Sequence, residues 1–297
     1  MVKQYGVLYQ DTRRALLQTE NVQDAGVLAR MLVCHASGKS QAEFLADRDL
    51  YASEKVVQEL GVEVAGFFQM SQKFLQFHAL GMMGQWEFYG LPLHVTPDVL
   101  IPRDDTCAVA DLAISQALFL DKDPRILDLC CGSGCIGLAI AANAPECRVL
   151  LGEISEGAIR VCRQNIRRNS MTGQVSVMGM DALQPPPRAL GELQCIVSNP
   201  PYIPLSDMET LDHSVKDYEP HLALFGGEDG YDFYTAIIRH WKKALVVGGR
   251  LYFEVGVGQA DTVLRMMRAE GFGDINIVPD GQGIPRVVYG TLLDGVF

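Results

Sequence analysis

The sequence predicts an α/β fold, with a mostly parallel sheet covered by helices on both faces and a small helical domain before it. Two observations predict the sheet. Short apolar runs alternate with helical segments over residues 104–297, as in strand–helix–strand units. A turn rich in small residues follows the first of these runs and opens a helix. Before residue 85, apolar residues instead recur at the three- and four-residue spacing of helices.

Composition narrows the class of protein. A chain of 297 residues is long enough for two domains, and its formal net charge of -11 gives a field that repels nucleic acid. Its eight cysteines include no C-x-x-C pair, so neither a zinc site nor a disulfide framework is indicated. Neither an apolar signal segment nor an uncharged run of roughly 18 residues occurs. We expect a monomeric cytoplasmic protein without metal, membrane span or direct nucleic-acid binding.

Three regions follow from the patterns along the chain. Helical spacing over residues 9–83 predicts a helical domain of residues 1–84. A period of two over residues 86–95 predicts a β-hairpin around Gly90-Leu91-Pro92, within a linker of residues 85–103. The α/β domain is then expected to occupy residues 104–297.

Within the α/β domain, apolar runs and helical segments alternate. We expect helices at residues 106–118, 136–144 and 155–169, and strands at 125–129, 149–152, 175–178, 196–198 and 250–255. Residues 275–278 and 287–292 flank a loop rich in proline and glycine. They are expected to close the sheet as an antiparallel hairpin.

Acidic or small residues follow three successive predicted strands. Asp128 lies at the end of the first strand, and the turn that follows contains Cys130, Cys131, Gly132, Ser133 and Gly134. Small side chains there let a ligand approach free backbone N–H groups. Glu153 ends the second strand, where a carboxylate can accept hydrogen bonds from ribose hydroxyls. Asp181 and Ala182 follow the third strand, where a carboxylate and a backbone N–H can meet an adenine edge.

This acidic setting favours a cofactor without phosphates, because a pyrophosphate near Asp128 would meet like charge. S-adenosyl-L-methionine carries a positive sulfonium and a positive α-amino group, so it fits better than NAD. Each carboxylate, considered alone, could instead be a turn residue or a helix cap with no ligand. Their joint placement is what favours the cofactor site.

Asn199-Pro200-Pro201-Tyr202 directly follows an apolar strand. The Asn199 oxygen and the Pro200 carbonyl can each accept one N–H of a planar NH₂ group, and the prolines keep the backbone extended. Such a nitrogen is a poor nucleophile that needs positioning more than a base. We expect Asn199, Pro200 and Tyr202 to act in catalysis, with Pro201 also at the substrate and Asn199 bordering the cofactor. A packed aromatic is the alternative role of Tyr202.

Together the motifs resemble the HemK/PrmC family of N5-glutamine methyltransferases of peptide chain release factors. The likeness covers residues 86–297 and rests on the turn, the Asn-Pro-Pro-Tyr segment, Leu100-Ile101-Pro102-Arg103, Glu219-Pro220, Gly226-Gly227-Glu228-Asp229-Gly230, Glu254-Val255-Gly256 and Arg286-Val287-Val288. It implies a seven-stranded Rossmann-like (class I) adenosyl-methionine-dependent methyltransferase fold with a helical substrate-recognition domain. It also implies that the substrate is the Gly-Gly-Gln glutamine of a release factor and that S-adenosyl-L-homocysteine is the product.

The resemblance implies a role for each part of the site. Residues 130–134 would hold the methionine end of the cofactor, Glu153 the ribose, and Asp181 with Ala182 the adenine edge. Asn199 and Pro200 would clamp the glutamine amide. The chain departs from the family pattern at several points: Cys130 replaces a glycine, Ala182 replaces a bulkier residue, and Asp104 and Cys107 interrupt a common motif. Residues 78–84 also lack the usual proline and Gln-Tyr pair before the hairpin.

Three other functions share parts of this pattern. A ribosomal-protein glutamine methyltransferase would use the same amide chemistry. A nucleic-acid methyltransferase could clamp the exocyclic amine of a flipped adenine or guanine with the same segment, although the acidic balance argues against it. A binding module that kept the fold without catalysis is disfavoured by the intact turn, Glu153 and Asn199.

Overall fold

The structure is a computed structural model that describes residues 3–17, 25–67, 85–120, 123–211 and 219–295. The described chain divides into two compact units, one ending at Phe67 and the other beginning at Gln85. Among the described helices, none has the length and apolar character that a membrane span requires.

The first unit is helical, as the spacing of apolar residues predicts. Its helices are α1 Tyr5–Leu16, α2 Ala25–Ser37, α3 Gln41–Ala46 and α4 Glu54–Phe67. Leu8, Leu32 and Phe44 are among the buried residues that join α1, α2 and α3 in one apolar cluster. The remainder of the predicted helical stretch, residues 68–83, lies outside the described residues.

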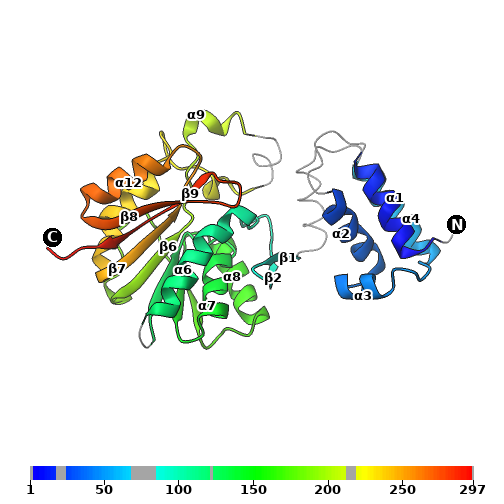
Figure 1. The fold of residues 1–297 in the computed structure, drawn as a ribbon, viewed down its shortest axis with the longest axis horizontal. Coiled ribbons are helices and arrows are strands. Elements are labelled where there is room, and N and C mark those ends of the chain that lie inside the picture. The colour runs from blue at the N-terminus through cyan, green and yellow to red at the C-terminus, as the bar shows by residue number, and fades with distance from the viewer. Residues whose placement is uncertain (1–2, 18–24, 68–84, 121–122, 212–218, 296–297) are drawn as a thin grey trace. The chain divides into compact units, whose positions relative to one another are not determined.

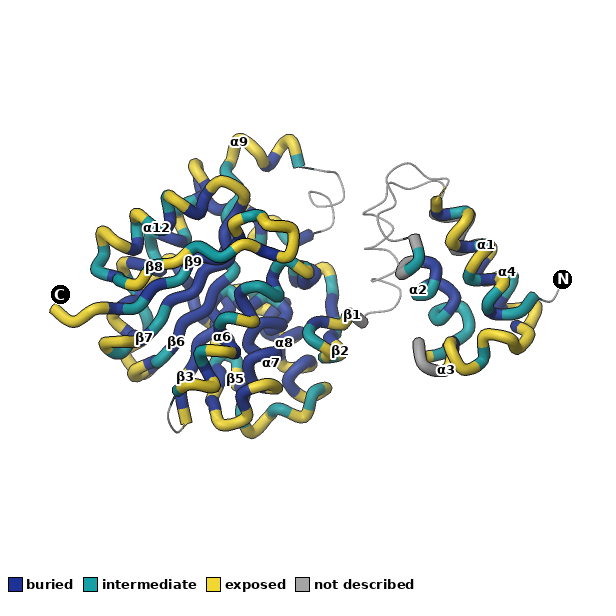
Figure 2. Tube along the Cα trace, in the orientation of Figure 1, coloured by how far each residue is buried: buried dark blue, intermediate teal, exposed yellow. Residues whose placement is uncertain are grey.

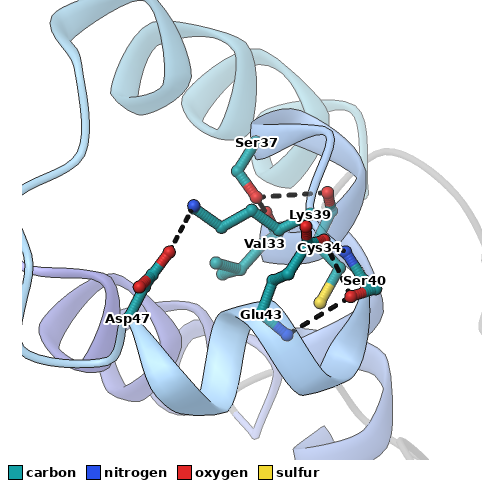
Figure 3. A network of polar contacts seen from close by, with 7 residues as sticks. All are labelled: Val33, Cys34, Ser37, Lys39, Ser40, Glu43 and Asp47. Carbon is teal, nitrogen blue, oxygen red and sulfur yellow. Dashed lines mark hydrogen bonds and ion pairs between the residues drawn. The ribbon is translucent and has the colours of Figure 1, made fainter.

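Polar contacts fix the start of α3 (Figure 3). The Ser40 hydroxyl accepts from the Glu43 N–H at 3.2 Å, and the Glu43 carboxylate accepts from the Ser40 N–H at 2.8 Å. This reciprocal arrangement satisfies donors that the first helical turn would leave free. Lys39 pairs with Asp47 at 2.7 Å across the same helix. A four-residue signal, Ser-x-x-Glu, therefore sets this helix boundary.

A two-stranded hairpin opens the second unit, with β1 at Gln85–Phe88 and β2 at Leu91–His94. Tyr89 and Gly90 form the turn with φ values of 56° and 75°, the backbone that a two-residue hairpin prefers. The hairpin prediction is confirmed, but the turn precedes the expected position, because Leu91 and Pro92 belong to the second strand.

Seven strands form the central sheet in the order β5-β4-β3-β6-β7-β9-β8. Strands β6, β7, β8 and β9 of this sheet are labelled in Figure 1. The strands are β3 Arg125–Leu129, β4 Arg148–Glu153, β5 Val175–Gly179, β6 Leu193–Ser198, β7 Leu245–Glu254, β8 Phe272–Pro279 and β9 Pro285–Leu292. Strands β3 to β7 pair in parallel, and β9 runs antiparallel to both of its neighbours. The predicted antiparallel closure is confirmed, with β9 inserted between β7 and β8.

The central strands are mostly buried (Figure 2). Successive residues of a strand point to opposite faces of the sheet, and both faces are covered by apolar clusters. Ile126 and Val197 belong to the apolar cluster that includes α6, α7 and α8, whereas their neighbours Leu127 and Ile196 belong to the cluster that includes α12. The helices are α6 Cys107–Phe119, α7 Cys135–Asn143, α8 Glu156–Arg168, α9 Leu205–Met208, α11 Asp232–Ala236, the π-helix Ile237–Trp241 and α12 Ala260–Ala269. The result is a three-layer α/β/α unit.

The chain order reverses between β3 and β6, which are adjacent in the sheet although β4 and β5 come between them in sequence. In open parallel sheets, ligands bind at the carboxyl ends of the strands where the order reverses in this way. Asp128 and Leu129 pair with Val197 and Ser198 there. The residues that follow β3 and β6 therefore begin side by side.

Candidate active site

A cavity lies at the carboxyl ends of β3, β4 and β6. Seven of the residues that the sequence singled out line it: Cys130, Cys131, Gly132, Ser133, Glu153, Asn199 and Pro201. The small-residue turn and the first residue of the Asn-Pro-Pro-Tyr segment therefore share one cavity. Six others do not line it: Asp128, Gly134, Asp181, Ala182, Pro200 and Tyr202.

The turn after β3 needs an unusual backbone. Cys130, Gly132 and Gly134 have φ values of 62°, 54° and 81°, all in the left-handed region. A Cβ on Gly134 would lie 2.9 Å from Leu151 Cδ1, so this position also requires the missing side chain. Cys130, which replaces a glycine of the family pattern, is thus a non-glycine residue in a conformation that favours glycine.

Asp128 lies fully buried behind this turn. Its Oδ2 accepts from the Gly137 N–H of α7 at 2.8 Å, whereas its Oδ1 has no hydrogen-bond partner among the described residues. Burial raises the pKa of Asp128 to about 7. The buried hydroxyl of Ser133 likewise has no partner in the described part of the chain. Two unsatisfied polar atoms beside a cavity are typical of a ligand site.

Glu153 lines the cavity, but backbone donors already use most of its carboxylate. Oε1 accepts from Ile154 and Ser155 at 2.8 and 2.9 Å, and Oε2 accepts from Gly132 at 3.0 Å. A carboxylate offers about four acceptor positions, so about one is left for a ligand. Glu153 therefore orders the turn in addition to facing the cavity.

Asp181 and Ala182 make local contacts instead of facing this cavity. The Asp181 carboxylate accepts from the Leu183 N–H at 2.9 Å, which is the turn role that competed with ligand binding. Ala182 is 4% exposed, and its carbonyl accepts from the Trp241 indole N–H at 3.0 Å. Because the Ala182 side chain packs in the apolar core, only its backbone and the free side of Asp181 remain for a ligand.

Asn199 and Pro201 line the cavity, whereas Pro200 and Tyr202 of the same segment pack into the unit. Pro200 is buried, and the Tyr202 ring packs against the core cluster that contains α12. Burial raises the pKa of Tyr202 to about 12, so its hydroxyl stays protonated. A Cβ on Gly226 would lie 2.7 Å from Tyr202 Cα, and one on Gly230 would lie 2.5 Å from the Tyr202 carbonyl oxygen. The glycine-rich loop therefore packs directly on this backbone.

Several cavity residues were given no role from the sequence. They come from the segment between β2 and α6, from the segment between β6 and α11, and from α11 itself: Asp98, Val99, Leu100, Pro102, Thr106, Pro220, Leu222, Ala223 and Phe233. Leu100, Pro102 and Pro220 stood in recognised motifs, so a signal existed for them. Phe233 and Leu222 carried no such signal, because an apolar residue in a loop or short helix is usually core.

Comparison with known proteins agrees with this fold. Residues 111–215 match the model of the methyltransferase small domain family. A methyltransferase from Pyrococcus furiosus of known structure has 15% identity and a TM-score of 0.51, covers 74% of this chain and 96% of its own, and shows the fold alone.

Two curated relatives are more similar in sequence. The release factor glutamine methyltransferase of Geobacter sulfurreducens is 41% identical over 213 residues, which are 71% of this chain and 72% of that protein. The one from Clostridium acetobutylicum is 40% identical over 202 residues, which are 68% of this chain and 70% of that protein. With this identity over most of both chains, the protein belongs to the release factor glutamine methyltransferase family.

Proposed function

We propose that this protein transfers a methyl group from S-adenosyl-L-methionine to the N5 amide nitrogen of the glutamine in the Gly-Gly-Gln motif of peptide chain release factors. One observation carries the proposal: Asn199 and residues 130–133 line the same cavity. The cavity therefore contains both an amide oxygen that can accept from a substrate NH₂ group and a small-residue turn that a cofactor can approach. Membership of the family supports release factors as the substrate class.

The residues present fit the proposed cofactor. Asp128 Oδ1 and Ser133 Oγ are buried without partners among the described residues, and Glu153 keeps about one acceptor position at the cavity. Carboxylates at the ends of β3 and β4 favour a ligand with positive groups. When bound, the cofactor supplies an electrophilic methyl group on a sulfonium. Asp128 and residues 130–134 would hold its methionine end, Glu153 its ribose, and Asp181 with the Ala182 N–H its adenine.

The proposed catalytic device is positioning of a neutral amide. Asn199 Oδ1 and the Pro200 carbonyl would each accept one N–H of the glutamine NH₂ group, which directs its nitrogen lone pair toward the methyl donor. Positive charge develops on that nitrogen during transfer. The two acceptors then bind it more strongly than they bound the neutral amide, so they stabilise the transition state preferentially. Pro201 would border the pocket, and so would Tyr202 with its hydroxyl protonated.

The helical unit and the cysteines support the rest of the assignment. We propose that residues 1–84 recognise the release factor and that residues 85–103 connect them to the methyltransferase domain of residues 104–297. All eight cysteines are free thiols. Reduced thiols fit the cytoplasm, where release factors act on ribosomes.

Mass spectrometry tests the proposal. The purified protein is incubated with a release factor and cofactor labelled in its methyl group, and the label is then localised by peptide fragmentation. We expect one added methyl group, on the glutamine of Gly-Gly-Gln, and none on a release factor with glutamate at that position. Label on a ribosomal protein or on nucleic acid, with none on the release factor, would overturn the assignment.

A further inference from the structure

Glu254 lies beside Asn199 at the carboxyl end of the sheet. Strands β6 and β7 are parallel, with Ser198 paired to Phe253, so Asn199 and Glu254 follow that pair on adjacent strands. Glu254 is 3% exposed and does not line the cavity, whereas Asn199 does. Asn199 therefore links a buried carboxylate to the cavity.

The Glu254 carboxylate has few competing contacts. Hydrogen bonding from the side chains of Thr106 and Asn199 lowers the pKa of Glu254, so both side chains lie beside its carboxylate. Its Oε2 atom has no hydrogen-bond partner in the described part of the chain. Thr106 is itself 2% exposed. With Oε2 unused, the carboxylate keeps acceptor capacity for the Asn199 amide in addition to its contact with Thr106.

The chemistry of the two groups fixes which end of the amide faces the carboxylate. An ionised carboxylate only accepts hydrogen bonds, and of the two ends of an Asn side chain only NH₂ donates. The amide oxygen then points away from Glu254. If the amide turned over, its NH₂ would meet the NH₂ of the substrate, and two donors cannot bond to each other. The ends of an amide have almost the same shape, so packing alone does not select one.

We propose that Glu254 is a positioning residue, which binds the Asn199 NH₂ and thereby presents the Asn199 oxygen to the substrate amide. This inference rests on the proposed function. It assigns Glu254 no contact with the substrate or the cofactor.

The surroundings of Glu254 make its ionisation sensitive to pH. Burial is the largest cause that raises its pKa, the neighbouring charge of Asp105 raises it further, and Arg286 lowers it, with a net value of about 7. The other titratable side chains that interact with Glu254 are Tyr202, Tyr234, Cys107 and Cys135, and the pKa of each is raised above its usual value. Those four groups stay neutral near pH 7, whereas Glu254 changes charge there. Asp128 on β3 also has a pKa of about 7, so the comparison with Glu254→Gln is what assigns the acid limb to Glu254.

The test measures kcat against pH from about 6 to about 8.5, with saturating cofactor and release factor. For the wild type we expect the rate to fall on the acid side of about pH 7, because a protonated Glu254 can donate to Asn199 and turn the amide over. Glu254→Gln keeps the side chain's size but cannot ionise. We expect it to be about 10-fold slower at pH 8, the loss of one charge-assisted hydrogen bond, and to lack the acid limb.

Controls separate positioning from a structural role. Cofactor affinity and the KM for the release factor should change little in Glu254→Gln. Its thermal unfolding temperature at pH 8 should rise, because a buried carboxylate with a raised pKa destabilises the fold. Glu270→Gln alters a carboxylate at the end of α12 that pairs with Lys242 at 3.0 Å, and it should keep the wild-type rate and pH profile.

Two results would overturn the inference: a wild-type rate that is flat through pH 7, or Glu254→Gln with the wild-type rate and acid limb. Failure of the proposed function is distinct. In that case, the wild type would not label the glutamine at any pH.

Discussion

The side-chain amide of Gln259 donates to the carbonyl of Tyr202 over 3.0 Å. The same NH₂ group lies 3.3 Å from the Gly230 carbonyl, and Gln259 Oε1 accepts from the Gly256 N–H at 3.0 Å. Gln259 is 8% exposed. One buried side chain at the start of α12 thus joins the Asn-Pro-Pro-Tyr segment, the glycine-rich loop and the residues after β7. The position of Asn199 depends on this junction.

Replacing Gln259 should therefore impair both stability and turnover. Gln259→Leu leaves the Tyr202 carbonyl and the Gly256 N–H without a partner, at a cost of about 1–3 kcal/mol for each buried polar group. We expect a lower urea midpoint and a rate reduced at least about 10-fold, with cofactor affinity less affected. Gln164→Leu, at an exposed position of α8, is the matched control. Normal turnover by the Gln259 variant would mean that the segment holds its position without this bridge.

Glu153 is expected to control cofactor affinity through two effects. The glutamine of Glu153→Gln has one oxygen in place of two, so it cannot accept all three backbone hydrogen bonds that the carboxylate accepts. Its NH₂ group would also face a backbone N–H, and two donors cannot bond to each other. Charged hydrogen bonds of this kind are worth about 1.5–3 kcal/mol, so we expect the Kd of the cofactor, measured by calorimetry, to rise about 10- to 100-fold. Its neighbour Glu156 is exposed, and Glu156→Gln should leave the Kd unchanged. Equal cofactor affinities for the wild type, Glu153→Gln and Glu156→Gln would mean that Glu153 does not contribute to cofactor binding.

Asp128 should make the ligand-free protein more stable in mild acid than near neutrality. Its pKa in the folded state is about 7, above the usual 3.8, so the folded state binds a proton that the unfolded state has lost between those values. This contribution to the unfolding free energy therefore falls as pH rises through that window, by about 1.4 kcal/mol per pH unit. Denaturant unfolding at about pH 5 and about pH 7 should show the decline in the wild type and a smaller one in Asp128→Asn. Parallel curves for the two proteins would contradict the shifted pKa.

Cys130 offers a test of the strained turn. Its φ of 62° costs an L-residue roughly 1–2 kcal/mol, and glycine escapes that cost at an entropic penalty of about 0.5–1 kcal/mol. Cys130→Gly should therefore be more stable to urea than Cys130→Ala by up to about 1 kcal/mol, since both variants remove the sulfur. Cys130→Val should be the least stable, because a β-branched side chain fits this backbone worst. A more stable alanine variant would mean that the turn relaxes to a different conformation.

Much of the fold could be predicted because its signals are local. The strand from Arg125 to Leu129 has the predicted bounds, since its apolar residues are framed by a charged residue and a glycine turn. Strand β7 extends back to Leu245 beyond the predicted start, because Gly248 and Gly249 break the apolar run without ending the strand. The helix α12 has polar and apolar residues on separate faces, but it was not singled out from the sequence.

The site could be predicted only in part, for physical reasons. The turn and Asn199 were found because backbone geometry and amide chemistry need particular residue types there. The orphaned atoms of Asp128 and Ser133 could not be foreseen, because burial and the lack of a partner depend on packing. Gln259 was missed for a similar reason: an amide that joins three distant segments has no local pattern.

The proposed role of Asn199 is to hold the substrate amide facing the cofactor. The rate of methyl transfer in a variant without that side chain tests this role. Single-turnover methylation of a release factor is compared for wild type and Asn199→Ala, with cofactor affinity measured on the same samples. Loss of one transition-state acceptor predicts a rate lower by about 10²- to 10³-fold, with cofactor affinity nearly unchanged. Asn276→Ala, at an exposed position of β8, should match the wild type. A wild-type rate in Asn199→Ala would contradict the account.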